Sequence, residues 1–218
     1  MVSSSTCGKA QKPLFVGAEA VPSDAVVLFD GKDLSKWVRR DTDEPAGWKV
    51  ENGYMEVVPR SGSIVSKELF TDCQLHVEFW LPLMADAQGQ ARANSGVYLQ
   101  GRYEIQVLDS YGLDSKDDDC GGIYKLAGPV VNASRPPEQW QTYDVFFRAP
   151  RFNEHGVKTT NARISVLHNG IWIHHDLEVP EATGGELDRN YSEPGPIMLQ
   201  DHSNTVRYRN VRVRPLGG

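Results

Sequence analysis

Two carboxylates mark the first stretch of the sequence that could do chemistry. Glu104 and Asp109 lie in GRYEIQVLDSYG, residues 101–112, where polar and apolar residues alternate and Gln106 stands between the two acids. Alternate residues of a β-strand share a face of the sheet. If the polar face lines a groove, the acids are candidates for acid–base catalysis or sugar binding. If that face is open to solvent, they have no chemical role.

The spacing of these residues resembles the E-x-D-x-x-E signature of retaining jelly-roll glycosidases, in which the first acid is the nucleophile and the last is the general acid. Strict alternation would place Glu104 and Asp109 on opposite faces, so the resemblance predicts a β-bulge near Leu108 that turns Asp109 back toward Glu104. Retaining hydrolysis needs two carboxyls about 5 Å apart. Gln106 replaces the middle acid and cannot ionise, which disfavours direct hydrolysis.

A histidine forms the second candidate site. The stretch LQDHSN, residues 199–204, is predicted to place Gln200 and His202 on one face of a strand. Histidine exchanges protons near neutral pH and suits general acid–base catalysis. The alternative is a histidine that only caps a strand end and satisfies loop carbonyls. The arginines of VRYRNVRVRP, Arg209 among them, either protect a sheet edge or clamp a sugar oxygen or an anionic group.

Short alternating runs, separated by turn residues, predict the elements that position these groups. No long stretch has helical spacing, and Asn52-Gly53 and Asn169-Gly170 are typical of two-residue hairpin turns. This pattern predicts an all-β fold, a jelly-roll sandwich of two antiparallel sheets. The runs lie at residues 25–29, 47–58, 74–82, 96–108, 140–150, 162–175, 196–202 and 205–216.

One predicted face of these runs is rich in hydrogen-bonding groups. Antiparallel sheets often leave one face open to water, so this face is expected either to line a groove or to be ordinary solvated surface. The set comprises Gln74, His76, Glu78, Arg102, Glu104 and Gln106.

Composition and charge limit the kinds of protein that this sequence can encode. We expect one domain, residues 25–218, after a flexible N-terminal tail, residues 1–24. The formal net charge of −6 argues against a nucleic-acid partner, and no apolar run reaches the about 20 residues of a membrane span. Cys7, Cys73 and Cys120 favour neither a disulfide framework nor a zinc site. The start, MVSSSTCGKAQK, has no apolar signal segment, so we expect a cytosolic chain or an export signal that this sequence does not include; a lipid on Cys7 is left open.

A series of longer motifs resembles the 3-keto-disaccharide hydrolase domain family over about residues 25–216. That family has a concanavalin-like jelly-roll fold, and its members are commonly exported bacterial proteins of carbohydrate degradation. The resemblance therefore implies an extracellular or periplasmic enzyme that cleaves glycosides already oxidised to a ketone at sugar carbon 3. The motifs are LFDGKDLSKW (28–37), GSIVSKELFTDCQLHVEF (62–79), NSGVYLQGRYEIQVLDSYG (94–112), NASRPPEQWQTYDVFFRAPRF (132–152), ARISVLHNG (162–170) and GPIMLQDHSNTVRYRNVRVRPL (195–216).

The implied substrate gives the candidate residues new roles. A 3-keto group acidifies the proton on carbon 2, so a base can remove it, the aglycone leaves by elimination, and water addition completes net hydrolysis. His202 or Glu104 would be the base, with Asp109 as orienter or acid. A divalent cation on these three groups would also stabilise the enolate, and the sequence leaves this open. The residues expected to hold the substrate are Asn94, Arg102, Gln106, Tyr124, Trp140, Gln200 and Arg209.

Three other interpretations stand beside the keto-glycoside one. The same fold and groove would suit a carbohydrate-binding module without catalysis, a retaining glycosidase acting on unoxidised sugar, or a purely structural domain. The keto-glycoside interpretation also needs a separate oxidoreductase that supplies the ketone. A base with a perturbed pKa in the groove would favour an enzyme over a binding module.

Overall fold

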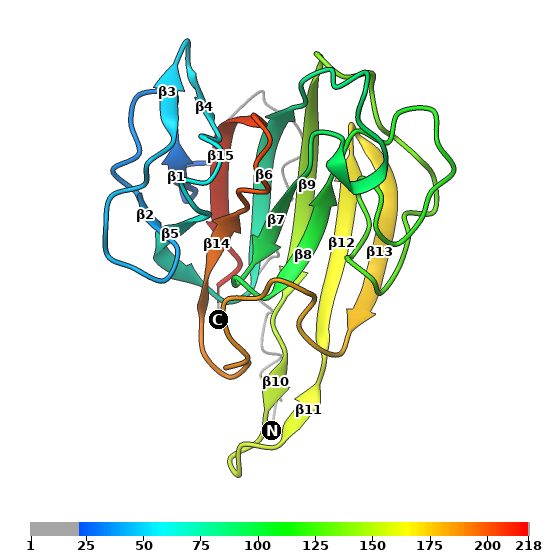
Figure 1. Cartoon of the computed structure of the whole chain (residues 1–218). Helices are drawn as coiled ribbons and strands as arrows, with labels where there is room; N and C mark the ends of the chain where they lie inside the picture. The colour runs from blue at the N-terminus through cyan, green and yellow to red at the C-terminus, as the bar shows by residue number, and fades with distance from the viewer. Residues whose placement is uncertain (1–21, 218) are drawn as a thin grey trace, which may run out of the picture.

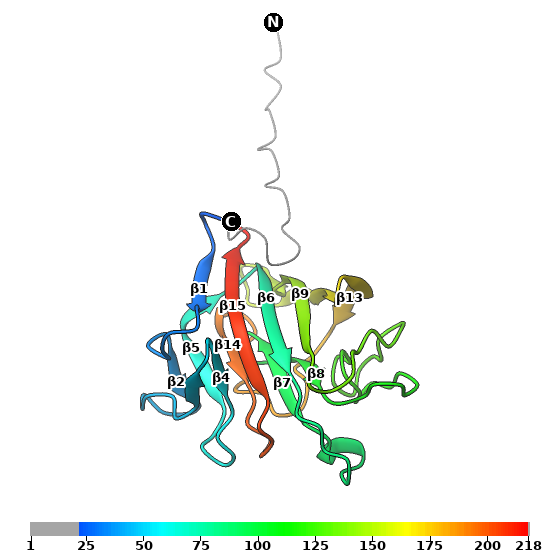
Figure 2. The ribbon, with the colours of Figure 1, turned by 90° about the horizontal axis from the view of Figure 1, so that it is seen from above.

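The computed structural model describes residues 22–217 as two antiparallel β-sheets packed face to face (Figure 1), and Figure 2 shows the two layers from above. The larger sheet has eight strands in the order β13-β12-β9-β6-β15-β4-β3, with β1 also paired to β15. The smaller sheet has five strands in the order β2-β5-β14-β7-β8, and β10 and β11 form a separate two-stranded ribbon. The predicted jelly-roll sandwich is confirmed.

The strand bounds are as follows: β1 (Val26–Phe29), β2 (Trp37–Arg39), β3 (Lys49–Glu51), β4 (Tyr54–Glu56), β5 (Ile64–Phe70), β6 (Cys73–Trp80), β7 (Ser95–Leu99), β8 (Tyr103–Val107), β9 (Trp140–Arg148), β10 (Arg151–Phe152), β11 (Lys158–Thr160), β12 (Ala162–His168), β13 (Ile171–Val179), β14 (Gly195–Leu199) and β15 (Arg207–Pro215). A single 3-10 turn, η1 (Gly89–Ala91), is the helical segment of the described residues.

The two Asn-Gly turns form the hairpins β3–β4 and β12–β13. Asn52 and Gly53 have φ values of 48° and 80°, and Asn169 and Gly170 have φ values of 53° and 80°. A two-residue turn with positive φ at both positions matches the twist of the flanking strands, and asparagine and glycine tolerate that backbone. The local sequence therefore fixes both turns as predicted.

The core lies between the two sheets and is built from alternate residues of each strand. Val77 and Phe79 of β6 face inward from the larger sheet, and Val97, Ile105 and Val107 of β7 and β8 face inward from the smaller one; all are fully buried. Since alternate residues point to opposite faces, this burial forces the residues between them on β7 and β8 to the outer face of the smaller sheet.

The predicted single polar face is wrong, because its members belong to different sheets. Gln74, His76 and Glu78 lie on β6, in the larger sheet, whereas Glu104 lies on β8, in the smaller one. His76 and Glu78 belong to an ion-pair network there, with His76 Nδ1 2.7 Å from Asp144 Oδ1. Alternation assigns a side chain to a face of its strand but not to a sheet.

The sequence also raised expectations about the N-terminal tail, the three cysteines and a membrane span. Most of the proposed tail and Cys7 lie outside the described residues. Cys73 and Cys120 are free and buried. Within residues 22–217, no helix has the length and apolar character that a membrane crossing requires.

Candidate active site

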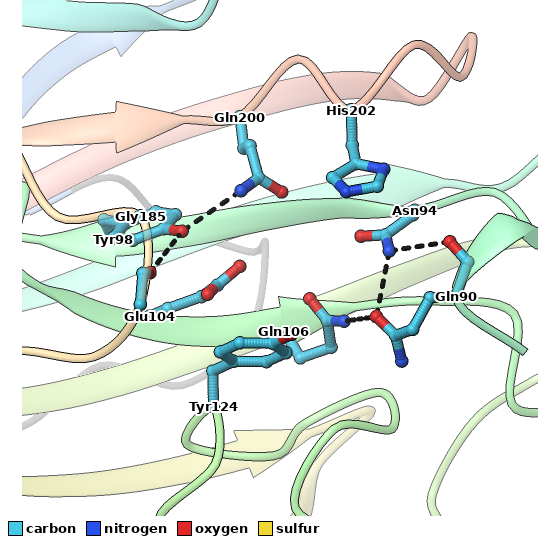
Figure 3. Close-up of a pocket in the computed structure, with 10 residues that line it drawn as sticks. Gln90, Asn94, Tyr98, Glu104, Gln106, Tyr124, Gly185, Gln200 and His202 are labelled. Atoms are coloured by element: carbon cyan, nitrogen blue, oxygen red, sulfur yellow. Dashed lines mark hydrogen bonds between the residues drawn. The ribbon is translucent and has the colours of Figure 1, made fainter.

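A polar cavity of about 190 Å³ lies on the outer face of the smaller sheet (Figure 3). Strands β7 and β8 form its floor, the residues after β14 form one wall, and three loops complete it. The lining residues are Gln90, Asn94, Tyr98, Glu104, Gln106, Tyr124, Gly184, Gly185, Gln200 and His202. Six of the predicted site residues, from four separate stretches, thus meet at one place that is large enough for a single small polar ligand: Asn94, Glu104, Gln106, Tyr124, Gln200 and His202.

Strand β8 places Glu104 and Gln106 in this cavity, as the alternation predicts. Ile105 and Val107, which alternate with them, are part of the core. The pairing of β7 with β8 is regular, with Gly96 opposite Gln106. The two polar side chains therefore project from neighbouring positions of the same face.

Strand β8 is at the edge of the smaller sheet. Two loops hydrogen-bond to its outer side and form a wall of the cavity. The Gln106 N–H donates to the Gly122 carbonyl at 2.9 Å, in the loop that carries Tyr124. The Thr183 N–H donates to the Arg102 carbonyl at 2.9 Å, and the Glu104 N–H donates to the Thr183 hydroxyl at 2.8 Å. Because the edge strand is paired in this way, the cavity walls are fixed to the same strand that carries Glu104.

The Glu104 carboxyl has an unusual electrostatic environment. Its side chain is buried, with 3% of the residue exposed. Burial raises its pKa from 4.5 to about 8, and a hydrogen bond from the Tyr98 hydroxyl opposes that shift. Burial disfavours the charged form of a carboxyl. Glu104 can therefore hold or release a proton close to neutral pH.

His202 lies on the wall opposite Glu104, and its ring points into the same space (Figure 3). Strand β14 ends at Leu199, so Gln200 and His202 follow the strand rather than continue it. Their loop is held in place because the Gly62 N–H donates to Asp201 Oδ2 at 2.9 Å. His202 itself is exposed, which leaves it at the open side of the cavity.

An amide network lines the remaining wall. Asn94 Nδ2 donates to the backbone carbonyl of Gln90 at 2.8 Å and to its side-chain Oε1 at 3.0 Å. Gln106 Nε2 donates to the same Oε1 at 2.9 Å. Gln90 belongs to η1, so the short 3-10 turn positions two predicted substrate-binding residues.

Asp109 is not part of this cavity, and the predicted β-bulge is wrong. The β7–β8 register stays regular until Val107. The chain then leaves the strand, and the buried Asp109 forms an ion pair with the partly exposed Arg92, at 2.7 Å between Nη2 and Oδ2. The proposed cation ligands Glu104, Asp109 and His202 are therefore not gathered, and residues 22–217 contain no cluster of three metal-ligating acidic, histidine or cysteine side chains.

Arg102 was predicted to bind substrate but does not line the cavity. It follows the turn that joins β7 to β8 and is buried. Its Nε donates to Asp188 Oδ1 at 2.7 Å and its Nη1 to the Glu193 carbonyl at 2.8 Å. The guanidinium thus anchors the loop before β14 instead of facing the cavity.

Trp140 and Arg209 also lie away from the cavity, on the larger sheet. Trp140 begins β9 and Arg209 is in β15. The guanidinium carbon of Arg209 lies 4.0 Å from the centre of the Trp140 ring, and Arg209 Nε donates to Glu78 Oε2 at 2.7 Å. They stack on each other, and neither lines the candidate site.

Four lining residues were not among the predicted ones: Gln90, Tyr98, Gly184 and Gly185. Tyr98 alternates with Val97 and Leu99, so the strand pattern places it on the correct face. Gly185 has a φ of 77°, and a Cβ there would lie 2.7 Å from the Tyr98 hydroxyl. No sequence pattern predicts that the loop of Gly184 and Gly185 contacts strands β7 and β8, which lie about eighty residues earlier in the chain.

Gly96→Ala is expected to reduce any activity that depends on Glu104. A Cβ at Gly96 would lie 2.3 Å from Glu104 Oε1 and 2.9 Å from Tyr98 Cε2, so the carboxyl must move. Overpacking of this kind typically costs about 1–3 kcal/mol. Turnover and thermal unfolding of Gly96→Ala should be compared with Gly47→Ala, where the nearest atom to a new Cβ is 3.7 Å away. Equal turnover in both variants would contradict the predicted displacement.

Comparison with known families gives a match over almost the whole described chain. The family model of the 3-keto-alpha-glucoside-1,2-lyase-like domain matches residues 24–214. The chain belongs to this family. This match confirms the family resemblance that the sequence motifs indicate. The protein is therefore a carbohydrate-active enzyme of this family.

Solved structures agree with this membership in the lyase-like family. A "putative glycosyl hydrolase" from Parabacteroides distasonis ATCC 8503 is 34% identical, with 94% of each chain covered and a TM-score of 0.81. A second protein of that description and organism is 21% identical over 89% of this chain and 94% of the other, with a TM-score of 0.63, and shows the fold alone. No curated protein matches the chain.

Proposed function

We propose that this protein cleaves 3-keto-glycosides by removing the proton on sugar carbon 2 and eliminating the aglycone from carbon 1. The observation that carries the proposal is the buried Glu104 carboxyl with a pKa of about 8, which faces His202 in a sugar-sized polar cavity. A catalytic base works best when its pKa lies near the working pH. The description of the family, which concerns 3-keto-alpha-glucosides, supports the same chemistry.

Glu104 is the base in this scheme. Its carboxylate takes the proton from carbon 2, and the electron pair of that C–H bond moves onto the ketone oxygen as an enolate. When the enolate collapses, a double bond forms between carbons 1 and 2 and the bond from carbon 1 to the aglycone oxygen breaks. The products are an unsaturated keto sugar and the free aglycone, and addition of water to the double bond completes net hydrolysis.

Gln200 is the donor for the enolate oxygen. Its Nε2 donates one hydrogen to the Tyr98 hydroxyl at 3.1 Å, whose own single hydrogen is shared between the Gly184 carbonyl at 3.0 Å and the Glu104 carboxyl. A primary amide has two N–H hydrogens, so the second is free to reach a ligand oxygen in the cavity. A donor fixed in advance stabilises charge as it develops.

The single carboxylate of the cavity supports elimination over direct glycoside hydrolysis. Among the described lining residues, Glu104 is the one acid, whereas a retaining glycosidase needs a nucleophile and an acid about 5 Å apart. Elimination needs a base, a donor for the enolate and a proton source, and these can be Glu104, Gln200 and His202. A preceding oxidation at carbon 3, by a separate oxidoreductase, must supply the substrate.

The deciding experiment compares methyl α-glucoside with its 3-keto form. The purified protein is expected to release methanol from the keto-glucoside and not from the unoxidised one. An unsaturated keto sugar seen by NMR before hydration would support elimination. Cleavage of the unoxidised glucoside would favour a retaining glycosidase, and sugar binding without cleavage of either would favour a binding module.

His202→Ala is expected to lower turnover of the keto-glucoside by about 10²-fold, at the low end for a general acid. His202 is exposed at the open side of the cavity, where water can partly replace it as the proton donor to the leaving oxygen. The loss should shrink for a glycoside with an acidic aglycone, such as 4-nitrophenol, which leaves without protonation. An equal loss for both aglycones would contradict the role of His202 as the acid.

A further inference from the structure

The orientation of each amide in the Gln90 network follows from groups that can only accept. The Gln90 backbone carbonyl accepts from Asn94 at 2.8 Å, which identifies that side-chain atom as nitrogen. The Asp118 backbone carbonyl accepts from Gln90 Nε2 at 2.7 Å and from Gln106 Nε2 at 3.3 Å. Because a carbonyl oxygen has no hydrogen to donate, none of the three amides can be turned around without losing a bond.

The network uses every side-chain N–H hydrogen of two of these amides. Asn94 Nδ2 donates both of its hydrogens to Gln90, one to the backbone carbonyl and one to Oε1. Gln106 Nε2 donates one to Gln90 Oε1 and one to the Asp118 carbonyl. What Asn94 and Gln106 have left for a ligand is therefore two carbonyl oxygens, which accept and cannot donate.

Figure 3 shows both oxygens on the cavity side of the network, with the amide nitrogens turned toward Gln90. Gln106 Oε1 is buried and has no hydrogen-bond partner among residues 22–217. A buried acceptor without a donor is unfavourable, because no hydrogen bond replaces the one that the atom makes with water in the unfolded chain. A ligand hydroxyl that donates to it would remove this cost.

We infer that Gln90 is a positioning residue that fixes Asn94 and Gln106 as acceptors, so that this wall selects sugars offering hydroxyl donors at two positions. The choice of a sugar as the ligand rests on the proposed function. Gln90 touches no ligand in this scheme; its Oε1 accepts from both amides at once and so sets the direction in which each of them faces. Without this Oε1, Asn94 keeps only the Gln90 backbone carbonyl and Gln106 keeps only the Asp118 carbonyl at 3.3 Å, so each amide has a freed N–H that can turn to a ligand instead.

Unoxidised methyl α-glucoside and its 2-, 4- and 6-deoxyfluoro analogues provide the test. Fluorine is close to a hydroxyl in size but carries no hydrogen, so each analogue removes one donor without adding bulk. Equilibrium binding is measured by ligand-observed NMR. This measurement needs no cleavage, so its result does not depend on the proposed reaction. The wild-type protein is expected to bind one or two of the analogues about tenfold more weakly than the parent glucoside.

Variants of Gln90 separate positioning from plain structural support. Gln90→Met removes the shared acceptor and is expected to reduce the fluorine penalty to less than about threefold. Gln90→Glu, measured at a pH low enough to protonate the new carboxyl, keeps an oxygen that accepts from both amides and a donor for the Asp118 carbonyl, and should retain the penalty. Gln88→Met, at an exposed position just before η1 with no side-chain capping bond, is the matched control and should leave the penalty unchanged.

Gln106→Leu gives a second test if Gln90→Met does not fold. It removes one acceptor directly and should abolish the penalty for one analogue only. Equal wild-type binding of all four sugars, or an unchanged penalty in folded Gln90→Met or Gln106→Leu, would overturn the inference. Binding of none of the sugars would overturn the inference and count against the proposed function. The expected binding pattern without cleavage of the keto-glucoside would sustain the inference and reject the proposed function.

Discussion

Glu104→Gln is expected to lower turnover of methyl 3-keto-α-glucoside by about 10²–10⁴-fold, the usual contribution of a general base. The substitution keeps the size of the side chain and a hydrogen-bonding oxygen, but it removes the group that accepts the proton from carbon 2. Since Glu104 is the one acid among the described lining residues, no neighbouring carboxylate can take over. The loss should appear in kcat, because a glutamine can still help to bind the sugar.

The pH profile gives this prediction an independent signature. With a pKa of about 8, the Glu104 carboxyl of the free enzyme is largely protonated at neutral pH, and the base form grows as pH rises. We therefore expect kcat/KM to increase with pH up to about 8 and then to level off. The residual activity of Glu104→Gln should lack this rise.

Glu154→Gln is the matched control for both measurements. Glu154 lies in the β10–β11 loop with 87% of its side chain exposed, far along the chain from any lining residue. It should turn over the keto-glucoside at the wild-type rate with the wild-type pH profile. If Glu104→Gln behaved in the same way, Glu104 would not be the base.

The sequence predicts the fold well because local patterns determine it. Alternation from Val97 to Val107 decides which side chains enter the core, and the two Asn-Gly turns need the positive φ values that they adopt. The same alternation places Glu104 and Gln106 on the outer face of β8. These are properties of neighbouring residues, which a sequence contains directly.

The site is predicted only in part because it depends on which strands become neighbours. Trp140 and Arg209 were expected to hold the substrate, but their strands belong to the sheet that does not carry the cavity. Asp109 was linked to Glu104 by the spacing of another enzyme group, and here the strand ends before it. Gln90 and Gly185 enter the site from loops, where periodicity gives no information about tertiary contacts.

Arg102 also shows that the role of a residue depends on a tertiary contact that the sequence does not reveal. Its position after Gln100-Gly101 and before a polar strand suggested a ligand contact. Instead its charge pairs with Asp188 at 2.7 Å, in a loop that follows by more than eighty residues. An arginine that closes a long-range loop and one that binds a substrate look alike in sequence, because the partner decides the role.

Glu104→Gln is also expected to make the protein more stable at alkaline pH, even as it removes activity. In the folded state the pKa of Glu104 is about 8, against an ordinary value of 4.5. The folded protein therefore holds this proton more tightly than the unfolded chain does. Wherever the folded state binds more protons, the free energy of unfolding falls as pH rises, so this carboxyl lowers stability progressively from about pH 4.5 to about pH 8.

Glutamine cannot ionise, so the variant lacks this loss. The free energy of unfolding of Glu104→Gln minus that of the wild type should grow by up to about 1.4 kcal/mol per pH unit across the window and stay constant above about pH 8. Urea denaturation of both proteins at a series of pH values from 5 to 9 measures the difference, in which contributions from other titrating groups cancel. Parallel curves would mean that Glu104 has an ordinary pKa, whereas a growing gap would show that the fold carries a buried acid at a cost to its own stability, as a group retained for proton transfer does.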